Sequence, residues 1–273
     1  MGLYRATPDD GVAWVTGAST GIGRQVALDL AREGYVVAAT ARGADKLAEL
    51  VTAANGLKGR IVAFACDVTD EAAVLATISA IESDLGPVAL AVFNAGTYFP
   101  ARGDALDTSN FVKTYKINVF GVINGLVPLV DRMRERGRGQ VAIVGSVSGY
   151  GGLPMAAAYG ASKAALNNMA EALKFDFDKM NIRIQIINPG FVDTPLTEKN
   201  NFVMPALMPV DKASARIVQG LKTGGFEVTF PRHFTWFLKF LNLFPHPVYF
   251  WFMNWAMGWR KRPLGPMRRP KKG

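Results

Sequence analysis

The chain has 273 residues, 49% of them hydrophobic, and carries 31 Lys and Arg against 22 Asp and Glu, a net charge of +9. This composition excludes an intrinsically disordered chain and supplies enough apolar side chains for a sizeable core. The single cysteine, Cys66, excludes an intrachain disulfide, which fits a reducing compartment, and the first residues contain no long apolar run that would predict a secretory signal.

Short apolar segments alternate with helical patterns along most of the chain. The segments predicted as strands are 12–17, 35–41, 60–67, 89–96, 140–147, 182–190 and 226–230. The segments predicted as helices lie near 21–33, 44–54, 70–85, 110–136, 156–180 and 211–223. Strands that alternate with helices predict a parallel sheet with right-handed crossovers, and consecutive apolar residues predict strands covered on both faces. The expected fold class is therefore α/β, a Rossmann-like doubly wound parallel sheet of about seven strands.

The segment TGASTGIG (16–23) follows the first predicted strand and opens the first predicted helix. Glycines at this place let backbone N–H groups and the positive end of the helix approach a pyrophosphate. Gly17 would permit the tight turn, Gly21 the close approach, and Gly23 the close packing of helix on strand. The spacing G-x-x-x-G-x-G differs from the usual G-x-G-x-x-G, but its position predicts a dinucleotide site.

Over about residues 10–230 the sequence resembles the short-chain dehydrogenase/reductase family, whose glycine motif is TGxxxGxG. Further motifs of that family follow in order, including CDV with Asp67, NAG at 94–96, YxxxK at 159–163 and PGFVDT at 189–194. The resemblance implies a catalytic set made of Asn118, Ser146, Tyr159 and Lys163. It also implies a nicotinamide cofactor, bound by Gly17, Ser19, Thr20, Gly21, Ile22, Gly23, Asp67, Val68, Asn94, Ala95, Gly96, Tyr159, Lys163, Pro189, Gly190, Val192 and Thr194.

The end of the second predicted strand indicates which nicotinamide cofactor is preferred. In NAD-binding Rossmann folds an acid there bonds the ribose 2′-hydroxyl, whereas this strand ends Thr40-Ala41-Arg42. A carboxylate would repel a 2′-phosphate, and a guanidinium can bind it in a fork geometry. We therefore predict NADP, with NADPH preferred over NADH, Arg42 on the phosphate, Thr40 assisting, and Ser19 and Arg24 nearby. The alternative is that Arg42 is a surface arginine without a ligand.

Tyr159 and Lys163 lie four residues apart, so on a helix they share one face. A nearby ammonium, together with an oxidised nicotinamide, is expected to lower the tyrosine pKa from its usual value near 10. Tyr159 would then act as acid in carbonyl reduction and as base in alcohol oxidation. Ser146 would hold the substrate oxygen, and Ser148 is a second candidate for that role. As the family resemblance implies, Lys163 would bond the nicotinamide ribose and Asn118 would anchor a water that links Lys163 to solvent.

These residues predict an oxidoreductase that interconverts a ketone or aldehyde and an alcohol, on a lipophilic substrate. Reduction of a 3-ketoacyl group is an alternative within the enzyme class. A non-catalytic NADP-binding sensor or scaffold is the alternative outside it, because fold alone does not prove turnover. Members of the family commonly form oligomers through helices such as 110–136 and 156–180, so the resemblance also leaves a homo-oligomer open.

Residues 1–231 are predicted to form the catalytic domain, and residues 232–273 an aromatic and basic helical extension. Nine cations and no acid follow Glu227, and the remaining 22 cations equal the 22 acids, so the whole excess charge lies in this tail. Pro245 and Pro247 predict two short helices, and Trp251, Trp255 and Trp259 are spaced to share one helix side.

This tail predicts peripheral membrane contact through residues 233–273, with aromatic side chains at the interface and cations on anionic headgroups. A lid over the substrate cleft and a subunit interface are the alternatives. No nucleic-acid partner is expected, since no base-reading module is recognisable. No metal site is expected, because His233 and His246 lack companion ligands. The expected location is the cytoplasm, with the protein resting on the cytoplasmic face of a membrane.

Overall fold

The computed structural model describes residues 2–199 and 204–265, and its centre is a seven-stranded sheet in the order β3-β2-β1-β4-β5-β6-β7. The strands are β1 Val12–Thr16, β2 Val36–Ala41, β3 Arg60–Ala65, β4 Val88–Phe93, β5 Gly139–Val144, β6 Ile182–Pro189 and β7 Glu227–Phe230. Every neighbouring pair is parallel. The predicted fold class is confirmed, and the strand order reverses between β1 and β4, where ligands bind in open α/β sheets.

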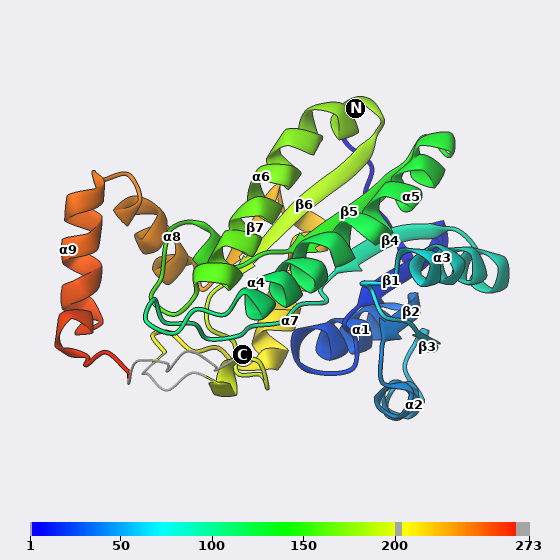
Figure 1. The fold of residues 1–273 in the computed structure, drawn as a ribbon. Coiled ribbons are helices and arrows are strands. Elements are labelled where there is room, and N and C mark those ends of the chain that lie inside the picture. Colours follow the sequence, from blue (N-terminus) through cyan, green and yellow to red (C-terminus); the bar gives the residue numbers. More distant parts are fainter. Residues whose placement is uncertain (1, 200–203, 266–273) are drawn as a thin grey trace.

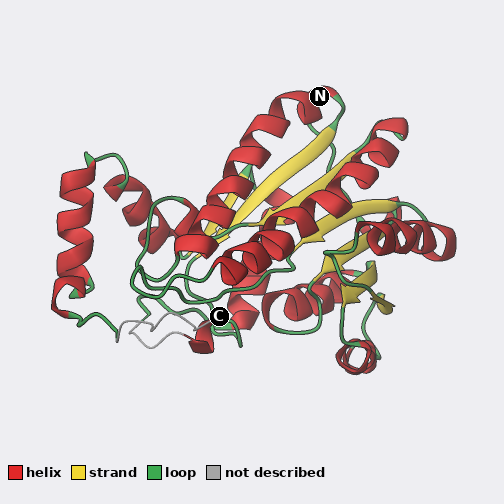
Figure 2. Ribbon diagram, in the orientation of Figure 1, coloured by secondary structure: helices red, strands yellow, loops and turns green. Residues whose placement is uncertain are grey.

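Helices cover both faces of this sheet (Figure 2). They are α1 Gly21–Glu33, α2 Ala44–Ala53, α3 Glu71–Leu85, α4 Thr108–Tyr115, α5 Gly121–Glu135, α6 Ala157–Lys179 and α7 Val210–Thr223, followed by α8 Arg232–Leu241 and α9 His246–Ala256. One apolar core joins α1, α2 and α7 to one face, and a second joins α3, α5 and α6 to the other. Consecutive apolar residues in the strands therefore reflect burial from two sides, as expected.

The predicted helix near 110–136 is confirmed as a helical run without a break, but it contains a π-helical segment, Lys116–Phe120, between α4 and α5 that was not predicted. A π-helical turn widens the hydrogen-bonded ring and is often found at functional sites. Here it carries the buried side chain of Asn118.

Two helices follow the last strand and lie beyond the carboxyl ends of the strands, with α9 at the left edge of the molecule in Figure 1. Pro231 precedes α8 and Pro245 precedes α9, so the predicted division of the tail into two short helices is confirmed. Trp259 is an exception to the predicted row of tryptophans. It follows Gly258, whose left-handed backbone ends the run after α9, and so it does not share a helix side with Trp251 and Trp255.

Candidate active site

A cleft of about 680 Å³ opens at the carboxyl ends of the strands. The predicted residues that line it are Gly17, Ser19, Thr20, Gly21, Ile22, Arg42, Asp67, Val68, Asn94, Ala95, Gly96, Ser146, Tyr159, Lys163, Pro189, Gly190, Val192 and Thr194. Three further predicted residues, Gly23, Thr40 and Asn118, are buried and stand outside this lining. The cleft therefore brings the glycine turn, the ends of several strands and the start of α6 into one place.

The glycine turn is shaped by close packing against the end of β4. Gly17 has a φ of +66°, and a Cβ there would lie 2.7 Å from the Ala95 Cα. A Cβ on Gly23 would lie 2.4 Å from the Gly17 carbonyl oxygen, which confirms the predicted close packing. The Asn94 side-chain amide donates to the carbonyl oxygens of Thr16 (3.1 Å) and Gly17 (3.2 Å), so Asn94 braces the turn.

The end of β2 and the first turn of α2 present positive charge to the cleft. Arg42 and Lys46 are both exposed and both line it, and Lys46 was not predicted. Thr40 is fully buried, and its hydroxyl accepts a hydrogen bond from the Trp14 indole (2.9 Å). The prediction that Thr40 assists in phosphate binding is therefore withdrawn. Arg24 also lies outside the cleft lining.

Tyr159 and Lys163 lie together at the start of α6, as their spacing predicts. The Lys163 Nζ is 5.6 Å from the centre of the Tyr159 ring and donates to the Val144 carbonyl oxygen (2.7 Å). Ser146 follows β5 and bonds Tyr159, and the Ser148 amide and hydroxyl both donate to the Ser146 Oγ, at 3.2 and 3.0 Å. Ser148 thus orients Ser146 rather than lining the cleft in its place.

The amide side chain of Asn118 holds the loop after β4 in place. Its Nδ2 donates to the Thr97 carbonyl oxygen (3.1 Å) and the Ser162 Oγ (2.9 Å), and its Oδ1 accepts from the Thr97 amide (2.7 Å). Both N–H groups of the amide are therefore used within the protein. The water that Asn118 is expected to anchor stays a prediction. Such a water could not accept a hydrogen bond from this side chain, because both of its N–H groups already have partners.

Comparison with known proteins decides the family. Residues 11–203 match the profile described as short chain dehydrogenase. The chain belongs to the short-chain dehydrogenase family. It is 35% identical to an uncharacterized oxidoreductase of Myxococcus xanthus over 237 residues. This alignment covers 87% of this chain and 94% of that protein.

Two further relatives of this short-chain dehydrogenase are informative. It is 34% identical to a 3beta-hydroxysteroid dehydrogenase of Mediterraneibacter gnavus over 71% of this chain and 70% of that one. The crystal structure of a short-chain dehydrogenase from Streptomyces avermitilis matches with a TM-score of 0.77 and 26% identity, over 93% of this chain and 99% of the other. The protein is thus an oxidoreductase of this family, which uses nicotinamide cofactors.

In this short-chain dehydrogenase site the pKa of Tyr159 is raised, whereas the sequence predicts that it is lowered. Burial raises the pKa of Tyr159 to about 12, against the lowering effect of its hydrogen bond with Ser146. The predicted lowering of this pKa is therefore wrong for the chain alone, because loss of water around the phenol dominates. Burial also lowers the pKa of Lys163 to about 8. For Cys66, burial raises the pKa of the thiol, as suits a structural residue.

A buried polar network behind Ser146 was not predicted. The Asn188 Oδ1 accepts from the Ser146 backbone amide (2.9 Å), and the Asn188 Nδ2 donates to the Glu227 Oε1 (2.9 Å). The same carboxylate accepts from the Tyr150 hydroxyl (2.5 Å) and from the Lys239 ammonium on α8. Burial acts to raise the pKa of Glu227, but the hydrogen bonds from these three donors together outweigh it, so the pKa lies below its usual value.

The inner sides of α8 and α9 pack on the loop that carries Ser146. Leu238, Leu241 and Met253 are buried in one cluster with Val147 at the start of that loop. The Tyr249 hydroxyl donates to the Gly152 carbonyl oxygen (2.9 Å). The extension therefore forms part of the wall around the active-site loop. Within residues 2–199 and 204–265, no helix combines the length and apolar character needed to cross a membrane.

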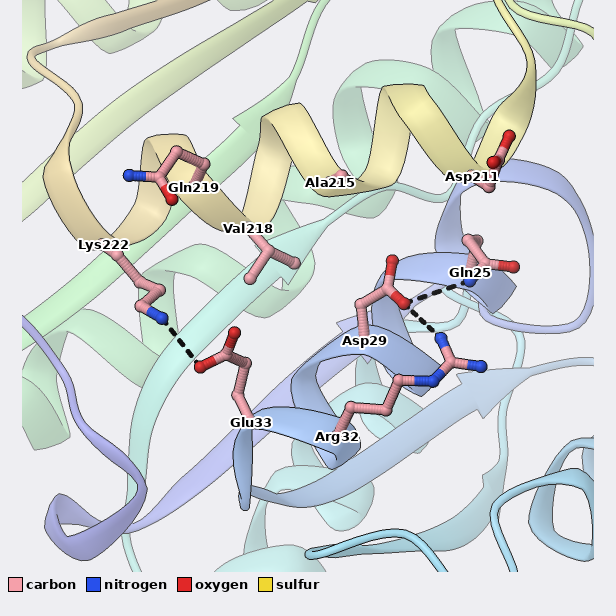
Figure 3. Close-up of a pocket in the computed structure, with 9 residues that line it drawn as sticks. All are labelled: Gln25, Asp29, Arg32, Glu33, Asp211, Ala215, Val218, Gln219 and Lys222. Carbon is pink, nitrogen blue, oxygen red and sulfur yellow. Dashed lines mark hydrogen bonds and ion pairs between the residues drawn. The ribbon is translucent and has the colours of Figure 1, made fainter.

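A second hollow, of about 520 Å³, lies between α1 and α7 (Figure 3). Four of its charged side chains form two ion pairs: Asp29 accepts from Arg32, and also from the Gln25 amide (3.1 Å), and Lys222 bonds Glu33 (2.7 Å). None of the predicted site residues lines it. We assign it no chemical role.

Proposed function

We propose that the protein is an NADP-dependent oxidoreductase that interconverts a carbonyl group and an alcohol on a lipophilic substrate. The observation that carries this proposal is that Ser146, Tyr159 and Lys163 line the same cleft as the glycine turn. A phenol, a hydroxyl and an ammonium beside a dinucleotide site are the groups that a hydride-transfer reaction needs for its proton and its developing charge.

The residues of the cleft fit a nicotinamide dinucleotide. At Gly17 a Cβ would collide with the backbone of Ala95, so a glycine there lets the turn pack against the end of β4. The turn and the start of α1 line the cleft, where helix N–H groups can bind a phosphate. Arg42 directly follows β2 and Lys46 lies in the first turn of α2, and both line the cleft, whereas the carboxylate of the lining, Asp67, follows β3. Two cations at this place favour binding of a ribose 2′-phosphate, and therefore of NADPH over NADH. When bound, the cofactor supplies or accepts the hydride.

Tyr159 is suited to give a proton to a carbonyl oxygen. With its pKa raised to about 12, the phenol keeps its proton at neutral pH, as an acid in carbonyl reduction must. Lys163 lies beside the ring, and its positive charge stabilises the phenolate that forms as the proton leaves. Ser146 donates a second hydrogen bond to the substrate oxygen and holds it within reach of Tyr159. The protonated phenol is therefore in the state that carbonyl reduction requires.

A lipophilic substrate is supported by the wall beside the active-site loop. Tyr98 packs edge-on against Tyr159, with ring centres 5.2 Å apart, and α8 and α9 place apolar side chains against the loop after Ser146. A relative at 34% identity is named a 3beta-hydroxysteroid dehydrogenase. The apolar contacts of Tyr159 and of the active-site loop, together with a relative of that name, favour a substrate with a large apolar part.

A panel of carbonyl compounds tests the proposal. NADPH and NADH consumption should be followed with a ketosteroid, a long-chain aldehyde, a 3-ketoacyl thioester and a short polar ketone. We expect turnover to rise with apolar size and kcat/KM to favour NADPH. Turnover of the 3-ketoacyl thioester alone would instead support acyl reduction, and tight NADPH binding without any turnover would support a sensor.

The cofactor preference has its own variant. Arg42→Ala should lower kcat/KM with NADPH by about 10- to 100-fold, the equivalent of one charge-assisted hydrogen bond, and leave the value with NADH nearly unchanged. Arg24→Ala, which lies outside the cleft lining, is the matched control. Equal losses with both cofactors would contradict the assignment of Arg42 to the 2′-phosphate.

A further inference from the structure

The outer sides of α8 and α9, away from the active-site loop, are apolar. Trp236 is 65% exposed, Trp251 63%, Trp255 71%, and Leu243, between the helices, 80%. A surface helix normally presents polar side chains to water on the side opposite its buried stripe. On α8, aromatic residues instead occupy the exposed side opposite the buried stripe, which is made of Thr235, Leu238 and Leu241. We call the exposed apolar side chains of α8, Leu243 and α9 the outer face.

Positive charge accompanies this outer face. Nine cations and no acid follow Glu227, and three residues separate the end of α9 from Arg260, Lys261 and Arg262. Among the residues that the structure describes, Lys239 is the one cation of this segment with an ion-pair partner, Glu227. The last four cations, from Arg268 onward, lie outside the described residues. The segment therefore combines large exposed aromatics with unneutralised cations.

We propose that the outer face binds the surface of an anionic lipid bilayer. Tryptophan is enriched where a bilayer meets water, and cations next to such residues bind acidic headgroups. A helix of about 20 apolar residues is needed to span, whereas α8 has 10 residues and α9 has 11. The two helices are therefore suited to lie in the plane of the interface, with their apolar sides in the acyl boundary.

Charge argues against a second copy of the chain as the occupant. In a symmetric dimer the same patch meets itself, so this acid-free basic segment would face an identical one. Each copy would bring its cations near the other's without any acid of the same segment to offset them. An anionic bilayer supplies both the apolar phase and the negative charge that this surface lacks.

Binding to lipid vesicles tests the proposal with the full chain and without turnover, so the result is independent of the proposed reaction. Vesicles of phosphatidylcholine alone are compared with vesicles that also contain phosphatidylglycerol, and bound protein is measured by co-sedimentation. We expect binding to the anionic vesicles that weakens as salt is added. Trp251→Ala combined with Trp255→Ala should lower the partition coefficient at least about tenfold.

Two further variants separate the contributions. Replacing Arg260, Lys261 and Arg262 by Glu should remove the preference for anionic vesicles. Phe175→Ala, which removes an aromatic that is 76% exposed on α6, is the matched control and should bind as the unaltered chain does. Thermal unfolding of each variant shows that the fold is kept, since all these side chains are exposed.

Three results would overturn the proposal. The first is absence of binding to both kinds of vesicle. The second is binding that is unchanged in the tryptophan variant. The third is binding of a different partner to the outer face in the absence of vesicle binding. It would be seen either as a dimer that does not form in the tryptophan variant, or as salt-sensitive binding to a single-stranded oligonucleotide.

Discussion

Burial of Lys163 predicts an unusual dependence of stability on pH. Its side chain is 3% exposed, and its Nζ donates to the Val144 carbonyl oxygen (2.7 Å). Burial lowers the pKa of this lysine from 10.5 to about 8. Between these two values the unfolded chain carries a proton on Lys163 that the folded chain has released. The free energy of unfolding should therefore rise with pH across this window, because the unfolded state binds more protons.

The size of the effect follows from the two pKa values. A shift of one pKa unit corresponds to about 1.4 kcal/mol, so the charged lysine lowers stability by about 3 kcal/mol near pH 7. Near pH 10 most of this cost has gone, because the folded chain holds the neutral amine. The stability that Lys163 alone contributes should therefore rise by about 2–3 kcal/mol from about pH 7 to about pH 10.

Lys163→Met isolates this contribution, since methionine fills a similar volume and does not titrate. The free energy of unfolding is measured by denaturant titration at several pH values for both proteins, and the difference is plotted against pH. We expect the unaltered chain to gain about 2–3 kcal/mol of unfolding free energy on the variant across this range. The same substitution at Lys212, exposed on α7, controls for loss of a lysine without loss of a buried charge. A difference that stays constant with pH for Lys163→Met would refute the reasoning.

Two further substitutions test the scaffold around the site. Glu227→Gln should lower stability by about 1–3 kcal/mol, because it breaks a hydrogen-bonded ion pair, and should reduce kcat as Ser146 loses its support. The pKa of Glu227 is lowered in the folded protein, so the stability difference between the unaltered chain and Glu227→Gln should be largest at neutral pH. It should shrink as the pH falls below about 4.5. A difference that persists in acid would contradict this. Gly17→Ala should lower the free energy of unfolding by about 2–5 kcal/mol, through strain at positive φ and contact with Ala95. Gly56→Ala, at positive φ with open space around it, should lower it by the strain alone. Equal losses in the two variants would rule out the collision.

The strands and the cleft could be predicted from sequence because their signals are local. Consecutive apolar residues mark strands that helices bury on both faces, and glycines mark a turn that must approach another backbone closely. The four-residue spacing of Tyr159 and Lys163 likewise fixes their shared helix side without knowledge of the fold. Gly258 was a local signal for the end of α9, and it would have separated Trp259 from Trp251 and Trp255.

Features that were missed depend on residues far apart in the sequence. The orientation of Thr40 is set by a hydrogen bond from Trp14 on the neighbouring strand. The network around Glu227 joins β7 to β6, to the loop after β5 and to α8, and no spacing in the sequence brings those groups together. The pKa of Tyr159 depends on how much water the fold removes, which residue types at helical spacing do not reveal.

The central claim is that the Tyr159 hydroxyl supplies the proton in carbonyl reduction. Tyr159→Phe removes this hydroxyl and keeps the ring that packs against Tyr98. Tyr4→Phe is the matched control, because Tyr4 lies outside the cleft lining, with its backbone amide donating to the Asn181 Oδ1 just before the amino end of β6. NADPH affinity, measured by fluorescence titration, should be unchanged in both variants, while kcat with the best carbonyl of the panel should fall by at least about 100-fold in Tyr159→Phe alone. Turnover by Tyr159→Phe at the rate of the unaltered protein would contradict the account.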